Sequence, residues 1–125
     1  MPRNVVDLNR LAEHGVVCSV GSNNILNPFT PFGDGQLLRQ VNMHGIVTQR
    51  GNDNEVQDLW NMATSSAAKL MRKDDYGIAV GNPADLVVLD APDAIMALRT
   101  VAPVLAAFKR GRRTVTREPV HLHKP

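Results

Sequence analysis

The segment from Val16 to Asp34 constrains the fold of this chain more than any other part of the sequence. It begins with Val16–Val20, an apolar run rich in β-branched residues that ends at Gly21. Runs of this kind are typical of strands buried on both faces of a parallel sheet. We therefore predict a buried parallel strand over residues 16–20. The loop that follows it lies where α/β folds bind ligands, at the carboxyl ends of the strands.

The loop over residues 21–34 mixes turn-forming polar residues with apolar side chains, which are Ile25, Leu26, Phe29 and Phe32. One interpretation is a binding loop, in which polar groups converge on a ligand while the aromatic rings exclude water. The other is a structured loop in which asparagine side chains cap turns. Both interpretations stay open at this point.

The length of 125 residues is enough for one ordinary domain. Aromatic residues make up only 4%, so we expect an aliphatic core. The formal charge of +2 implies no strong electrostatic field, although basic residues gather near the C-terminus at Lys109, Arg110, Arg112, Arg113 and Arg117. No stacking aromatics accompany this basic cluster, which favours a solvated hairpin over a nucleic-acid site.

The only cysteine, Cys18, cannot form an internal disulfide. Because it lies in a predicted buried strand, we expect an unreactive core thiol in a reducing compartment. No run approaches transmembrane length, and the N-terminus lacks the apolar region of a signal peptide. A cytoplasmic location with no membrane partner is the resulting expectation.

The remaining pattern predicts helices over 1–15, 36–49 and 52–71, a strand over 84–90, a helical turn over 94–99, and strands over 104–109 and 114–116. Gly15 is expected to end the first helix in a left-handed conformation. Asn52 and Glu55 form a capping box at the start of the longest helix, which places Trp60 in the core. A hairpin turn is expected around residues 110–112.

Three histidines are candidate ligands by residue type. His44 lies on a mixed helix face, which is typical of a surface or core-edge residue rather than a ligand. His121 and His123 would face one side of a strand, as metal ligands do, but further ligands are lacking and Cys18 is distant. We therefore favour a disordered tail over a metal site. A Ser-His-Asp triad stays open, although nothing marks a nucleophile.

Two motifs resemble the amidohydrolase superfamily. The first is residues 76–90, which read Tyr-Gly-Ile-Ala-Val-Gly-Asn-Pro-Ala-Asp-Leu-Val-Val-Leu-Asp and resemble the Gly-x-x-Ala-Asp-Leu-Val-Val-Leu-Asp strand of the superfamily. In the superfamily this strand is preceded by a helix that ends in Ala-x-x-Leu, and a later strand pair carries a glycine like Gly111. Residues 21–34 resemble the loop after the eighth barrel strand of bacterial cytosine deaminases and their relatives. Asn27-Pro28-Phe29 stands where cytosine deaminases have Asp-Pro-Trp.

This resemblance implies an α/β fold that is the C-terminal part of a (β/α)8 barrel together with strands of a small β-sandwich. Residues 1–72 would hold the last α/β units of the barrel, and residues 73–125 the C-terminal strands of the sandwich. The implied activity is hydrolysis of ring C–N bonds in cyclic amidines or amides by a metal-activated water. The implied cofactor is zinc or iron. The implied ligand is a small nitrogen heterocycle, with no nucleic-acid partner.

The chain departs from the family pattern at the site itself. Asn23 stands at the position of the family's metal-binding aspartate, so it is the candidate catalytic and metal residue. Asn24 and Phe29 are candidate substrate-binding residues, with Asp34 as a further contribution from the loop. An amide cannot accept a proton from water near neutral pH.

The family's His-x-His pair would lie upstream of residue 1. We therefore expect an isolated chain that binds no metal and has no hydrolase activity. The alternative is a non-catalytic module that oligomerises or completes a partner chain. Because a partial barrel leaves strand edges and apolar faces open, we expect a homo-oligomer or a complementing chain.

Overall fold

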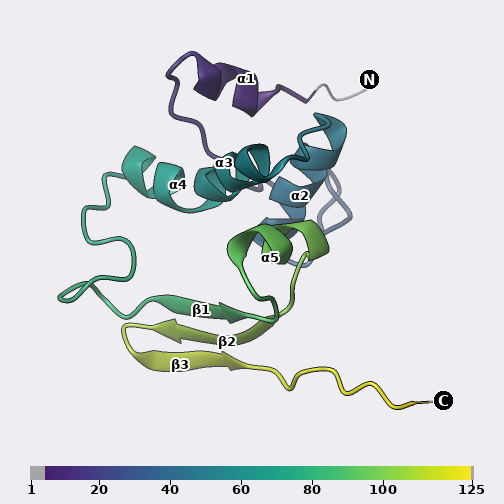
Figure 1. Cartoon of the computed structure of the whole chain (residues 1–125), viewed down its shortest axis with the longest axis vertical. Helices are drawn as coiled ribbons and strands as arrows, with labels where there is room; N and C mark the ends of the chain where they lie inside the picture. Colours follow the sequence, from purple (N-terminus) through teal and green to yellow (C-terminus); the bar gives the residue numbers. More distant parts are fainter. Residues whose placement is uncertain (1–4, 125) are drawn as a thin grey trace.

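The computed structural model of the chain describes residues 5–124, and a layer of helices stands beside a small sheet (Figure 1). The helices are α1 (Leu8–Glu13), α2 (Leu37–Val47), α3 (Asp53–Ala63), α4 (Ser65–Leu70) and α5 (Ala94–Thr100). The strands are β1 (Leu86–Leu89), β2 (Val104–Lys109) and β3 (Arg112–Thr116). Within the described residues, no helix is long and apolar enough to cross a membrane.

The core lies among α2, α3 and α5 and is aliphatic, as the composition predicts. Its buried residues are Cys18, Val41, Val56, Leu59, Met62 and Leu98. Gly45 lets α2 approach α3 closely, because a Cβ atom there would lie 2.8 Å from Leu59 Cδ1. Trp60 is partly buried and packs against this cluster, which agrees with its predicted place.

Arg50 joins α1 to the start of α3. Its guanidinium donates to Asp7 at 2.9 Å, and to Glu13 and Glu55 at 3.2 Å each. Asp7 is also the N-cap of α1, where its carboxylate accepts from the N–H groups of Asn9 and Arg10. The pKa of Asp7 is lowered, chiefly by the hydrogen bond from Arg50. This ion-pair cluster is therefore an electrostatic link between α1 and the rest of the helical layer.

The strand predicted over residues 16–20 is not present. Val16–Val20 has no strand partner among the described residues; Cys18 is buried, whereas Val16 is exposed. Val20 N–H donates to Met62 O at 3.2 Å, so the segment is tied to α3 instead of to a sheet. A parallel strand needs a neighbouring strand for its backbone hydrogen bonds, and residues 5–124 provide none at this place.

The helix predicted over 52–71 is divided into α3 and α4. Thr64, with φ −127° and ψ −98°, leaves the helical conformation between them. Its hydroxyl donates to Trp60 O at 2.8 Å, which is a known local competitor of the helical hydrogen-bond pattern. The first predicted helix is shorter than expected: α1 covers only Leu8–Glu13, and residues 1–4 lie outside the described part of the chain.

The strands form an antiparallel sheet in the order β1-β2-β3. Val87, Ala107 and Val115 are paired across the three strands. Asp85 holds the hairpin turn, because its carboxylate accepts from Arg110 N–H at 2.7 Å and pairs with Lys109. The predicted hairpin is thus confirmed, while the helical turn predicted over 94–99 is the full helix α5.

The division of the chain at residues 72 and 73 stays a prediction. The helix α5 belongs to the C-terminal part in that division, yet Leu98 is buried in the same cluster as Val41 and Leu59. Asn42 also donates to the carbonyl groups of Leu98 and Arg99, at 3.0 and 3.3 Å. The two parts therefore share packing in the helical layer.

Candidate functional site

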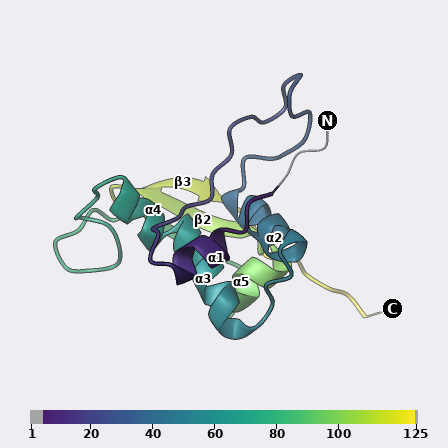
Figure 2. The same ribbon diagram turned by 90° about the horizontal axis from the view of Figure 1, so that it is seen from above.

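The loop between Val20 and α2 reaches out from the helical layer (Figure 2). It is shaped by amide hydrogen bonds. Asn27 Nδ2 donates to Asn24 Oδ1 at 2.7 Å, and Asn27 Oδ1 accepts from the N–H groups of Phe29 and Thr30, both at 3.0 Å. Asn27 therefore caps a turn, as the structured-loop interpretation of the sequence has it, and Asn24 holds the side chain of Asn27.

Asn23 lies next to this network without joining it. Its side chain is exposed, and within residues 5–124 it takes part in no hydrogen bond. Asn24 differs, since its amide oxygen already accepts from Asn27. The amide oxygen of Asn23 is therefore free to accept from an added ligand, whereas that of Asn24 already has one partner.

Asp34 closes the loop as a fixed anion. Arg39 donates to it at 2.8 Å, and Gln36 N–H donates at 3.0 Å. The hydrogen bond from Arg39, followed by that from Gln36, lowers the pKa of Asp34 to about 2. A carboxylate with so low a pKa stays ionised near neutral pH, so Asp34 is poorly suited to accept a proton in catalysis.

The aromatic side chains of the loop do not cover its polar groups. Phe29 is 74% exposed and Phe32 is 78% exposed. In the structure of this chain the two rings therefore do not shield the polar groups of the loop from water, so the binding-loop interpretation stays a prediction. Phe29 and Asn24 are close in the loop through their common partner Asn27, but the structure does not enclose a ligand between them.

The side chains present do not fit a catalytic metal. In the described part of the chain, no group of three or more histidine, cysteine, aspartate or glutamate side chains could hold an ion. Asn23 offers one neutral amide oxygen, a weaker ligand for a divalent cation than a carboxylate. His121 and His123 lie in the exposed tail beyond β3, which has no helix or strand.

His44 is a buried residue that the sequence interpretation left between surface and core edge. It is 7% exposed, and its Nε2 atom is buried without a hydrogen-bond partner. Burial lowers the pKa of His44, and the nearby charge of Asp7 acts in the opposite direction. The signal for burial was its spacing, because His44 follows the fully buried Val41 by three residues on α2.

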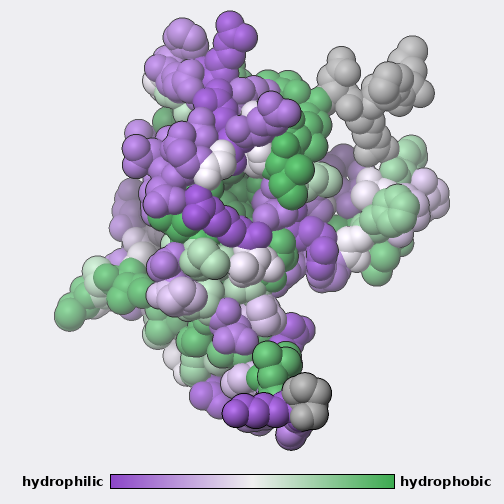
Figure 3. Space-filling model, turned by 45° about the vertical axis from the view of Figure 1, so that its right-hand side comes forward, coloured by the Kyte–Doolittle hydropathy of each residue, from purple (hydrophilic) through white to green (hydrophobic). Residues whose placement is uncertain are grey.

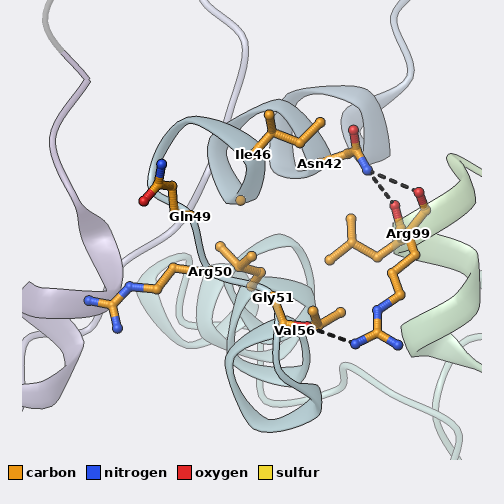
Figure 4. Close-up of a pocket in the computed structure, with 10 residues that line it drawn as sticks. Asn42, Ile46, Gln49, Arg50, Gly51, Val56 and Arg99 are labelled. Atoms are coloured by element: carbon orange, nitrogen blue, oxygen red, sulfur yellow. Dashed lines mark hydrogen bonds between the residues drawn. The ribbon is translucent and has the colours of Figure 1, made fainter.

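A pocket of about 420 Å³ lies among α2, α3 and α5 (Figure 4). Its polar rim is occupied by internal contacts: Asn42 caps the end of α5, and Arg99 donates to Gly51 O and to Asp53, both at 2.8 Å. Val56 and Ile46 contribute aliphatic surface. The hydrogen bonds of this rim therefore hold helices together.

The sequence pattern described as "Amidohydrolase family" matches residues 1–115. The chain therefore belongs to the amidohydrolase family, as the motif over residues 76–90 predicts.

Two curated relatives are hydrolases or deaminases by name. N-isopropylammelide isopropyl amidohydrolase of Pseudomonas sp. (strain ADP) is 30% identical over 89% of this chain and 28% of its own length. Pterin deaminase of Rhizobium rhizogenes is 36% identical over 71% of this chain and 20% of its own. The chain thus spans less than a third of the length of these relatives.

Crystal structures of 5-methylcytosine deaminase from Klebsiella pneumoniae superpose on 97% of this chain and 30% of theirs. The TM-scores are 0.87 and 0.88, at 30% and 29% identity. The structure of N-isopropylammelide isopropylaminohydrolase from Burkholderia multivorans, at 20% identity and a TM-score of 0.79, supports the fold. The predicted likeness to the cytosine deaminase group is confirmed.

Proposed function

We propose that this chain supplies the C-terminal part of an amidohydrolase that hydrolyses ring C–N bonds of cyclic amidines or amides. The observation that carries the proposal is the likeness to 5-methylcytosine deaminase over 97% of the chain. In this proposal residues 1–72 are the last α/β units of a (β/α)8 barrel, and Val16–Val20 gains strand neighbours there. Residues 73–125 are strands of the small sandwich.

The loop before α2 is the part of the chain that faces the substrate. Asn24 and Phe29 contact a nitrogen heterocycle, with the turn at Asn27 setting their positions through its hydrogen bonds. Asn23 takes the place of the family's acidic residue, and its amide cannot accept the proton that a carboxylate would. The chain alone is therefore inactive, and the zinc or iron of the resembling enzymes is not held by its residues.

The test is ammonia release from cytosine and related heterocycles, with added zinc or iron. We expect none from the 125-residue chain or from its Asn23→Asp variant. Ammonia release by either protein alone that a chelator abolishes would contradict this expectation. The matched control is Asn54→Asp, which makes the same change at an exposed position on α3.

A second arm adds a separate chain that carries the N-terminal barrel portion of a cytosine deaminase-like relative. We expect chelator-sensitive ammonia release when the two chains form a stable complex, and faster release with Asn23→Asp than with Asn54→Asp. A stable complex in which Asn23→Asp releases no ammonia from any of these heterocycles would contradict the proposal.

The second candidate function is a non-catalytic module that oligomerises or completes another chain. It is favoured by an exposed apolar projection between α4 and β1, at the left edge of Figure 3. Ile78 is 93% exposed and Val80 is 107% exposed, while Asn82 orders the turn by donating to Gly77 O at 3.1 Å. Sedimentation tests this surface: a stable monomer at high concentration argues against the module, and loss of association in Ile78→Ser supports it.

A further inference from the structure

The helix α1 is attached to the rest of the molecule by few interactions. It lies at one end of the helical layer (Figure 1). Its polar link is the cluster of Arg50 with Asp7 and Glu13, and its apolar link is the packing of Leu8 and Ala12 against the core. A six-residue helix is too short to be stable by itself in water, so these contacts decide whether α1 stays folded.

Two buried polar atoms in this region have no hydrogen-bond partner. One is Asn9 Oδ1 on α1, and the other is His44 Nε2 on α2. Asn9 is 4% exposed and His44 is 7% exposed. An unsatisfied buried polar atom favours any opening that lets water reach it, because water then supplies the missing hydrogen bond. The docked position of α1 is therefore less stable than its apolar contacts alone would make it.

His44 also lines an apolar cavity of about 310 Å³ between α2, the residues before α1 and residues 19–21. The other lining residues are Val5, Leu8, Ser19, Val20, Gly21, Gln40, Met43 and Val47, and none of them carries a charge. The one charge that acts on the imidazole is that of Asp7 on the N-cap of α1, and Arg50 already pairs with it. Nothing in this surrounding stabilises an imidazolium well.

We propose that protonation of His44 releases α1 from α2 and α3, so that the helix is a pH-sensitive flap over the segment that carries Cys18. Release lets water reach the imidazolium and Asn9. It also uncovers Cys18, which belongs to the cluster that Leu8 and Ala12 pack against and lines one pocket with Asn9 and Ala12. The change is local, because Val41, Val56 and Leu59 remain packed against Leu98 when α1 leaves.

The direction of the pH effect on the opening of α1 follows from the burial of His44. In the open form His44 is hydrated and binds a proton near its ordinary pKa of 6.5, whereas in the closed form burial lowers that pKa. The open form therefore binds more protons as the pH falls below about 6.5, and acid shifts the equilibrium toward opening. Above this pH the imidazole is neutral in both forms, and α1 stays docked.

The chain contains its own reporter, because Cys18 is its only cysteine. A dipyridyl disulfide modifies thiols at acidic as well as neutral pH. The rate at which it modifies Cys18 in the folded chain is divided by the rate in the urea-unfolded chain at the same pH, and this ratio is the normalised rate. We expect this normalised rate to rise as the pH falls from about 7.5 to about 5.5, by up to about tenfold, the limit set by an open form that binds its proton near pH 6.5. Trp60 fluorescence should stay unchanged over the same range.

Two substitutions separate the proposal from general acid sensitivity. His44→Leu removes the titrating group and fills the cavity with an apolar side chain, so its normalised rate should not change with pH. His44→Gln should likewise remove the pH response, and it serves if the leucine variant does not fold. His14→Gln, at the exposed C-cap of α1, should keep the full response.

The proposal is overturned if the response persists in both His44 variants or disappears in His14→Gln. It is also overturned if the normalised rate does not rise in the unmodified chain. A parallel change in Trp60 fluorescence would show global acid unfolding and would overturn it as well. None of these readouts depends on hydrolase activity, so they stand or fall separately from the proposed function.

Discussion

Gln49 occupies a backbone conformation that its side chain disfavours. Its φ is +56°, directly after the C-cap of α2, where Arg50 N–H donates to Gly45 O at 2.9 Å. This is a helix-ending pattern in which glycine is usually found. Such conformations cost a residue with a Cβ atom roughly 1–2 kcal/mol relative to the usual regions.

We predict that Gln49→Gly stabilises the chain by about 1 kcal/mol, since its exposed side chain contributes little packing. Urea unfolding followed by Trp60 fluorescence measures the change. The control is Gln57→Gly in the middle of α3, where glycine should destabilise by about 1 kcal/mol. The same substitution should thus raise the free energy of unfolding at one position and lower it at the other. Destabilisation by both would contradict the backbone argument.

At the scale of the element, α3 is the helix whose start is specified most locally. Asn52 Oδ1 accepts from Glu55 N–H at 3.0 Å, and Glu55 Oε2 accepts from Asn52 N–H at 3.1 Å. We predict that Asn52→Ala lowers the free energy of unfolding by about 1 kcal/mol, because it leaves an N–H group of the first turn without its partner. Thermal unfolding measures the loss.

The matched control for this cap is Asn52→Asp. Aspartate keeps an oxygen acceptor at the same place and adds a charge that the helix N-terminus favours, so its stability should equal or exceed that of the unmodified chain. If Asn52→Asp lost as much stability as Asn52→Ala, the side-chain cap would not be the cause.

The elements that could be predicted from sequence are those specified by neighbouring residues. The capping box at Asn52, the turn that ends α1 at Gly15 and the hairpin at Gly111 all depend on contacts within a few residues. The strand expected over residues 16–20 depends instead on a neighbouring strand, so its apolar pattern alone could not produce it. The break at Thr64 depends on one hydroxyl, which a helical period does not reveal.

In the candidate site too, features that depend on neighbouring residues could be predicted from sequence, and features that depend on distant residues could not. Turn-capping by Asn27 follows from asparagine chemistry over a few residues and is confirmed. The spacing of His44 from the buried Val41 indicates an inward position on α2, but Leu8 and residues 19–21, which line the same cavity, are distant in sequence, so the helix pattern alone did not separate the core edge from the surface. The catalytic and metal role of Asn23 and the substrate-binding roles of Asn24 and Phe29 stay predictions.

At the scale of the whole molecule, α5 connects the helical layer to the sheet. It lies between β1 and β2 in the chain, and its buried Leu98 is 2% exposed among residues of α2 and α3. Gln36 adds a second connection by donating to Ala102 O, just before β2, at 3.2 Å. If these contacts couple the two parts, the sheet and the helices unfold together.

We predict that Leu98→Ala lowers the free energy of unfolding by about 3 kcal/mol, because truncating a buried leucine loses apolar contacts and leaves a cavity. Because α5 joins both parts, amide hydrogen exchange at Phe108 in β2 should accelerate by the same free energy that Trp60 fluorescence reports for the helices. Leu122→Ala is the control, since Leu122 is 92% exposed and its loss should change stability by less than about 0.5 kcal/mol. Exchange at Phe108 that does not respond to Leu98→Ala would show that the strands after residue 72 form an independently stable unit.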